Sequence, residues 1–194
     1  MSNPPVALIT GSTSGIGLAV AHGFAKAGYA VMLNGLGSPA QIDDAKSQVA
    51  AHGGDVDYHP ADLSQPEQID AMVQATQARF GQIDVLVNNA GIQHTARVEA
   101  FPVDKWNAVI AINLTAAFHA QRLVLPGMQA RGKGRIINIA SVHGLVASVE
   151  KSAYVAAKHG ILGLTKVTAL ENAESGITCN AICPGWVLTP LVQK

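Results

Sequence analysis

The sequence predicts an α/β fold, in which helices cover both faces of one doubly wound parallel sheet. Short apolar runs rich in β-branched residues alternate along the chain with segments of helical periodicity. Most of these runs are almost continuously apolar, as expected of strands that are buried on both faces. With 194 residues, 48% of them hydrophobic, the chain is long enough to bury one sizeable core.

The elements follow one another without a linker, a low-complexity tract or an internal repeat, so we predict one domain over residues 1–194. Strands are predicted at 6–10, 30–34, 55–59, 83–89, 135–141 and 177–183. Helices are predicted at about 15–28, 39–52, 65–80, 104–131 and 152–174. In a sheet of this kind, ligands bind beyond the carboxyl ends of the strands, so each functional motif should follow a strand.

Composition excludes some classes of function. The formal net charge is zero, with 13 basic and 13 acidic residues and no run of like charge, so a nucleic-acid partner is not expected. The start of the chain lacks the features of a signal peptide, and polar residues interrupt the longest uncharged runs. We therefore expect a cytoplasmic protein with no membrane segment. Cys179 and Cys183 could form a metal-binding pair, but buried reduced thiols are the favoured interpretation and no metal is predicted.

A glycine-rich turn follows the first predicted strand. The segment TGSTSGIG places Gly11, Gly15 and Gly17 at the start of a helix. Glycines let the backbone approach a pyrophosphate, and the start of the helix offers free N–H groups and the positive end of its dipole. The alternative, a glycine turn that binds nothing, is weakened by the position of this turn after the first strand.

Cofactor preference should depend on the end of the second strand, where the chain reads LNGLG. No acidic residue is present there to bind a ribose 2′-hydroxyl, and neither Ser14 nor Leu36 is a cation that could neutralise a 2′-phosphate. Since a buried phosphate without a cation is costly, the sequence favours NAD over NADP.

Two further turns follow the third and fourth strands. Asp62 and Leu63 could bind an adenine ring through a carboxylate and an apolar edge, although Asp62 could equally be a cap of the helix at 65–80. The segment NNAG at 88–91 permits close approach of a ligand, or is an ordinary turn.

The residues best suited to chemistry are Ser141, Tyr154 and Lys158. Tyr154 and Lys158 are four residues apart and share a helix face, which Lys151 should also share. The usual pKa of a phenol is ~10. A neighbouring ammonium and the positive ring of an oxidised nicotinamide would favour its phenolate form. A phenolate can accept a proton from an alcohol. Ser141, at the end of the fifth strand, could hydrogen-bond the same oxygen. Each feature alone is more often structural, so the joint arrangement carries the prediction.

Asn113 interrupts the apolar segment AVIAINLTAAF. A buried amide needs hydrogen-bond partners, and we expect an ordered water between Asn113 and Lys158 that would provide an exit for a proton.

The motifs TGSTSGIG, NNAG, IASVHG, SAYVAAKHG and CPGWVLTP, together with Asn113, resemble the classical short-chain dehydrogenase/reductase family over essentially the whole chain. The resemblance implies a Rossmann fold, a homotetramer, a nicotinamide cofactor and the catalytic tetrad Asn113, Ser141, Tyr154 and Lys158. It also implies cofactor contacts from Gly11, Thr13, Ser14, Gly15, Ile16, Gly17, Leu36, Asp62, Leu63, Asn89, Gly91, Ile112, Tyr154, Lys158, Pro184, Gly185, Val187 and Thr189.

Finer matches in NNAGIQHT, IINIASVHGLV and AICPGWVLTPLVQK resemble bacterial members of this family that oxidise short 3-hydroxy acids. The resemblance implies a substrate site of Gln93, Ser141, His143, Lys151, Tyr154, Trp186 and Gln193, in which cation and amide donors bind the carboxylate. The alternatives are an NADP-dependent 3-oxoacyl-carrier-protein reductase, a non-catalytic nucleotide sensor and an inactive fragment. Family members commonly continue into lid helices and a seventh strand, so we expect these to be missing from this sequence.

Overall fold

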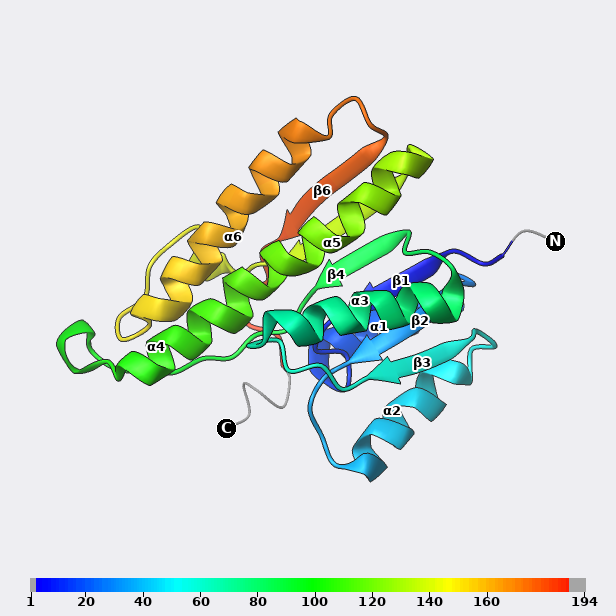
Figure 1. Ribbon diagram of the computed structural model, residues 1–194. Helices are drawn as coiled ribbons and strands as arrows, with labels where there is room; N and C mark the ends of the chain where they lie inside the picture. The colour runs from blue at the N-terminus through cyan, green and yellow to red at the C-terminus, as the bar shows by residue number, and fades with distance from the viewer. Residues whose placement is uncertain (1–2, 189–194) are drawn as a thin grey trace.

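The computed structural model describes residues 3–188 as one three-layer α/β unit. Its six strands are β1 (Val6–Ile9), β2 (Ala30–Asn34), β3 (Val56–His59), β4 (Val85–Asn88), β5 (Gly134–Ile139) and β6 (Ile177–Ile182). They form one parallel sheet in the order β3-β2-β1-β4-β5-β6 (Figure 1). The predicted doubly wound parallel sheet is therefore confirmed, and each predicted strand lies within two residues of its observed bounds.

Helices cover both faces of the sheet. They are α1 (Gly15–Lys26), α2 (Pro39–Ala50), α3 (Pro66–Phe80), α4 (Val103–Ile110), α5 (Ala116–Arg131) and α6 (Ser152–Glu171). Successive residues of β1 point to opposite faces. Leu8 packs with α3 and α5, whereas Ala7 and Ile9 pack with α1 and α2. Both faces of the central strands are buried, which explains why their sequences are continuously apolar.

The predicted helix at 104–131 is interrupted in its middle. Residues Ala111–Thr115 form a π-helical turn between α4 and α5, with the buried Asn113 at its centre. The whole segment Val103–Arg131 is long and apolar enough to cross a membrane by length and composition. A core helix of a globular protein passes the same test, and here α5 packs against α3, β4 and β5.

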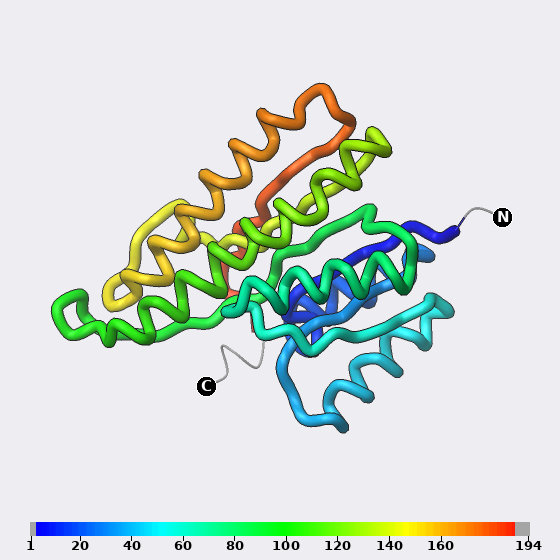
Figure 2. The backbone as a smooth tube through the Cα atoms, in the orientation of Figure 1, coloured from blue at the N-terminus to red at the C-terminus, as the bar shows by residue number. Residues whose placement is uncertain are grey.

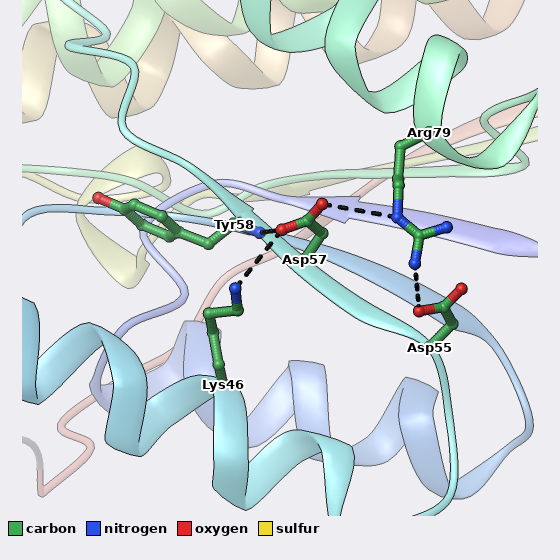
Figure 3. Close-up of polar contacts among 5 residues, drawn as sticks. All are labelled: Lys46, Asp55, Asp57, Tyr58 and Arg79. Atoms are coloured by element: carbon green, nitrogen blue, oxygen red, sulfur yellow. Dashed lines mark hydrogen bonds and ion pairs between the residues drawn. The ribbon is translucent and has the colours of Figure 1, made fainter.

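Charged side chains attach the edge strand β3 to the helices on either side of it (Figure 3). The Asp57 carboxylate lies 3.5 Å from Lys46 Nζ of α2 and 3.6 Å from Arg79 Nε of α3. Arg79 also pairs with Asp55. These pairs are exposed to solvent and contribute little each, so the edge strand depends mainly on Val56 and Tyr58, which pack on the core beneath α1 and α2.

All six strands end at the same edge of the sheet, and the chain order reverses between β1 and β4. The connections that follow β4 and β5 run out beyond this edge toward α4 and α6 (Figure 2). This edge is where a parallel sheet of this topology binds its ligand.

Candidate active site

A pocket of about 380 Å³ lies at this edge of the sheet. It contains nearly all the predicted cofactor-binding residues, from the glycine turn, the strand ends, α6 and the segment after β6. They are Gly11, Thr13, Ser14, Gly15, Ile16, Leu36, Asp62, Leu63, Asn89, Gly91, Ile112, Tyr154, Lys158, Pro184, Gly185 and Val187. Thr189 lies outside the described residues, and Gly17 does not line the pocket.

The glycine turn is shaped by close backbone packing. Gly11 has a φ of 61°, and a Cβ there would lie 2.8 Å from Cα of Ala90. A Cβ on the buried Gly17 would clash with the carbonyl oxygen of Gly11 and with the Asn89 amide. Gly17 therefore shapes the turn from behind rather than facing a ligand. Ser14 is the N-cap of α1, and its side chain makes no capping hydrogen bond, so it does not block the start of the helix.

Asn34 organises the pocket floor, a role that the sequence analysis missed. It is fully buried at the end of β2, and its amide nitrogen donates to the carbonyl oxygens of His59 (3.1 Å) and Ala61 (3.0 Å). Its amide oxygen accepts a longer bond from Gly11 N–H at 3.4 Å, and its backbone exchanges bonds with Ser12. Asn34 thus joins the ends of β1, β2 and β3. A buried asparagine that ends an apolar strand was the available signal.

The turn after β2 is held at two points. Thr13 Oγ1 donates to the carbonyl oxygen of Leu36 at 3.0 Å, and the Tyr58 hydroxyl donates to that of Gly35 at 2.7 Å. The Leu36 side chain is exposed at the pocket wall. Among the described residues that line the pocket, Lys158 is the one lysine or arginine, and it lies at the other end.

Asp62 is not a helix cap, because Gln65 occupies the N-cap position of α3. The Asp62 carboxylate instead accepts a hydrogen bond from Ser64 N–H at 2.9 Å, which leaves the residue exposed at the pocket rim beside Leu63. Of the two interpretations of Asp62, the structure removes the cap and leaves adenine binding as a prediction.

Ser141, Tyr154 and Lys158 meet in the pocket, as predicted. Lys158 is 3% exposed, and its Nζ donates to the carbonyl oxygen of Ile139 at 2.7 Å. Nζ lies 5.6 Å from the centre of the Tyr154 ring. Burial lowers the pKa of Lys158 to about 8, an effect partly opposed by the nearby Cys183. At neutral pH Lys158 is therefore mostly a buried cation beside the phenol.

Two opposing effects act on the pKa of Tyr154 in the protein alone. Burial raises the pKa of Tyr154 above its usual value, and a hydrogen bond with the Ser141 side chain acts in the opposite direction. In the protein alone, burial outweighs this hydrogen bond, so the neutral phenol is favoured.

Asn113 is 2% exposed, and its amide bonds backbone groups. It accepts from Ile92 N–H at 2.8 Å and donates to the Ile92 carbonyl oxygen at 2.9 Å. The buried amide therefore has the hydrogen-bond partners that it needs, and the ordered water between Asn113 and Lys158 stays a prediction. A separate cavity of about 10 Å³, bordered by Asn113 and Lys158, is nevertheless large enough for one water molecule.

Of the predicted substrate residues, Ser141 and Tyr154 line the pocket, whereas Gln93, His143, Lys151 and Trp186 do not. The His143 ring is 6.1 Å from the Tyr154 ring, and Lys151 Nζ is 5.6 Å from the centre of the Trp186 ring. Burial, followed by the charge of Lys151, lowers the pKa of His143. Lys151 is the N-cap of α6 rather than part of its helical face, yet it remains beside the site. Gln93 is exposed on the connection after β4, and Gln193 lies outside the described residues.

Comparison with known proteins agrees with this geometry. Residues 5–194 match the family described as short chain dehydrogenase. The chain is 59% identical to "D-beta-hydroxybutyrate dehydrogenase" of Cupriavidus necator, over 100% of this chain and 75% of that protein. It is 58% identical to the protein of the same name from Rhizobium meliloti, over 97% of this chain and 73% of that protein.

A solved structure of an actinorhodin polyketide ketoreductase variant with NADPH superimposes with a TM-score of 0.93. It is 40% identical, and the match covers 97% of this chain and 72% of that one. Membership of one family explains these matches. It also explains the sequence motifs, the sheet order and the pocket in which Ser141, Tyr154 and Lys158 meet. The chain belongs to the short-chain dehydrogenase family of oxidoreductases.

Proposed function

We propose that the protein is an NAD-dependent dehydrogenase that interconverts D-3-hydroxybutyrate and acetoacetate. The observation that carries the proposal is the meeting of Ser141, Tyr154 and Lys158 in one pocket, with His143 and Lys151 beside it. The identity of 59% and 58% to two proteins named D-beta-hydroxybutyrate dehydrogenase supports the choice of substrate.

The pocket fits a dinucleotide. Its volume falls in the usual range for cofactor sites, and its floor is the glycine turn, where a Cβ on Gly11 or Gly17 would disrupt the backbone. The start of α1 would bind the pyrophosphate, and Asp62 and Leu63 would bind the adenine. When bound, the cofactor supplies the acceptor for a hydride.

Tyr154 is the proposed base in the oxidation direction. Its phenolate accepts the hydroxyl proton of the substrate while the carbon that bears this hydroxyl loses a hydride. In reduction, Tyr154 returns the proton. Lys158, mostly protonated at neutral pH, supplies positive charge that favours the phenolate. The Ser141 hydroxyl binds the reacting oxygen and orients it toward Tyr154.

Proton exit is proposed to use the small cavity between Asn113 and Lys158. A water there would accept the proton that Lys158 passes on. The lowered pKa of Lys158, about 8, suits this role because the amine can then exchange its proton near neutral pH.

The substrate carboxylate is proposed to bind Gln93, His143, Lys151 and Gln193, with Trp186 beside them. The ammonium of Lys151 lies 5.6 Å from the centre of the Trp186 ring. Burial and, after it, the charge of Lys151 lower the pKa of His143, whose ring is 6.1 Å from that of Tyr154. A cation and an imidazole are therefore already close to Tyr154. A carboxylate brought to this place would gain charge-assisted hydrogen bonds.

The choice of NAD over NADP rests on missing charge. A 2′-phosphate at the end of β2 would meet Leu36 and the backbone of Gly35. The one lysine or arginine of the described pocket lining, Lys158, bonds the end of β5, three strands away in the sheet. The main alternative is an NADP-dependent 3-oxoacyl-carrier-protein reductase, a reaction close to that of the ketoreductase solved with NADPH. Such an enzyme would have no use for the cation at Lys151. A non-catalytic nucleotide sensor is disfavoured because Tyr154 and Lys158 both face the pocket.

We further propose a cytoplasmic homotetramer. Exposed apolar side chains on α5 and α6, including Phe118, Val167 and Leu170, support self-association. Light scattering on the purified protein tests this, and a monomer at micromolar concentration would contradict it.

The decisive experiment measures reduction of the cofactor with D- or L-3-hydroxybutyrate and NAD or NADP. We expect turnover with the D enantiomer and NAD, and a kcat/KM at least about tenfold lower with NADP. Faster reduction of an acyl-carrier-protein thioester with NADPH would instead establish the alternative.

A further inference from the structure

Glu150 has an unusual backbone conformation. Among the described residues, it is the one residue other than glycine with a positive φ, at 61°. Residues with a side chain rarely adopt this left-handed region, and they persist there only where the surrounding structure holds them. Glu150 lies in the turn directly before Lys151, at the start of α6.

This turn joins two connections that are far apart in the sequence. The Ala96 N–H donates to the carbonyl oxygen of Glu150 at 2.9 Å, and Ala96 forms an isolated parallel bridge with Lys151. The connection after β4, which carries Gln93, therefore lies against the connection between β5 and α6 beyond the strand ends (Figure 2).

Both the backbone and the side chain of Lys151 have defined neighbours. Its backbone is held by the bridge to Ala96 and by the first turn of α6, where the Val155 N–H donates to the Lys151 carbonyl oxygen at 2.8 Å. Its ammonium lies against Trp186 and close enough to His143 to lower the pKa of that ring. A change in the preceding turn would move the ammonium relative to both rings.

We propose that Glu150 is a positioning residue for the substrate carboxylate. Its left-handed turn sets the direction in which Lys151 enters the site and keeps the Gln93 connection beside it. The role belongs to the backbone, because the Glu150 side chain is exposed to solvent. This inference rests on the proposed function, because it assigns Glu150 to the binding of the same 3-hydroxy acid.

Two substitutions separate the backbone role from the loss of the carboxylate. Glu150→Gly and Glu150→Val remove the same charge, but glycine adopts a positive φ freely whereas a β-branched residue strongly resists it. Glu150→Val should therefore open the turn, and Glu150→Gly should keep it. Gly53→Val is the matched control for strain, because Gly53 has a φ of 86°, its Cβ would meet nothing within 4 Å, and it lies on the loop after α2.

The experiment measures KM for D-3-hydroxybutyrate, KM for NAD and the thermal midpoint of the intact protein. Glu150→Val should raise KM for the acid about tenfold or more over Glu150→Gly, with KM for NAD unchanged within about twofold, because a displaced Lys151 loses a charge-assisted bond. Gly53→Val should lower the thermal midpoint similarly without changing either KM. Equal values of KM for the acid in Glu150→Val and Glu150→Gly, or an equal rise in Gly53→Val, would overturn the proposal.

A second measurement needs no substrate, so it also decides the matter if the enzyme proves to act on another compound. In a Trp106→Phe background, the emission of Trp186 reports the nearby Lys151 ammonium. Glu150→Val should shift this emission in the same direction as Lys151→Met, and Glu150→Gly should leave it unchanged. An emission in Glu150→Val that matches that of the parent would refute the positioning role, whereas failure of the wild type to oxidise the hydroxy acid would refute only the proposed function.

Discussion

Replacement of Lys158 by methionine should stabilise the protein while it abolishes activity. Lys158 is 3% exposed, and burial lowers its pKa from 10.5 to about 8. A shift of one pKa unit corresponds to about 1.4 kcal/mol, so the buried charge costs roughly 3 kcal/mol of folding free energy below pH 8. Methionine keeps most of the apolar stem but leaves the Ile139 carbonyl oxygen without its donor, a loss of about 1 kcal/mol. The expected net gain at neutral pH is about 2 kcal/mol.

The pH dependence gives this prediction a distinct signature. The unfolded chain keeps the Lys158 proton up to about pH 10.5, whereas the folded protein loses it near pH 8. Because the unfolded state binds more protons in this window, the stability of the wild type rises between these two values, and the cost is fully present below them. Lys158→Met lacks this rise, so its advantage should decrease through the window and reverse at the upper end, where the lost bond to the Ile139 carbonyl oxygen leaves the variant about 1 kcal/mol less stable.

Urea unfolding followed by circular dichroism at several pH values measures both effects. Lys166→Met is the matched control, because Lys166 is exposed on the same helix and its replacement should change stability little at any pH. If Lys158→Met were less stable than the wild type at neutral pH, or if the difference between them did not depend on pH, the buried ammonium would not carry the cost that we assign to it.

Three further substitutions test the site. Lys151→Ala should raise KM for 3-hydroxybutyrate by about 10- to 100-fold with KM for NAD unchanged, as expected for a lost charge-assisted bond; steady-state kinetics with normal values would remove its role. Asn34→Ala removes the Asn34 bonds to the Gly11 N–H and to the carbonyl oxygens of His59 and Ala61. Urea unfolding should therefore show a loss of about 2–4 kcal/mol in stability, and calorimetry should show weaker NAD binding. Unchanged values would show that Asn34 does not hold the three strand ends together. Gly17→Ala should sharply reduce NAD affinity, because the added methyl group would clash with the Gly11 carbonyl oxygen. Gly23→Ala is its control: a methyl group there would meet nothing within 4 Å, so the protein should be unchanged or more stable by up to about 1 kcal/mol. Equal effects of the two substitutions would argue against close packing at the turn.

Much of the fold could be predicted because the strands are buried on both faces. In β1 and β2 every residue is buried, and such continuous apolar runs between glycine turns and amphipathic helices leave little ambiguity. The site could be predicted in outline for a related reason. Each motif follows a strand, and parallel strands end at one edge, so spacing along the chain becomes proximity in space.

The finer geometry could not be predicted, because it depends on contacts between distant segments. The π-helical turn at Asn113 closes only when its amide meets the backbone of Ile92, and helical periodicity contains no trace of that contact. Lys151 was expected on the helix face but caps the helix, since the bridge to Ala96 fixes the preceding turn. The raised pKa of Tyr154 follows from burial, which a local sequence pattern does not reveal.

The most direct test of the account compares wild type and Tyr154→Phe in oxidation of D-3-hydroxybutyrate with NAD, with cofactor affinity measured in parallel by fluorescence. The account predicts a kcat at least about a hundredfold lower in the variant, as for the loss of a positioned base, and a dissociation constant for NAD that changes less than about twofold. A variant that retains the wild-type kcat would show that the phenol at the pocket edge is not the proton acceptor.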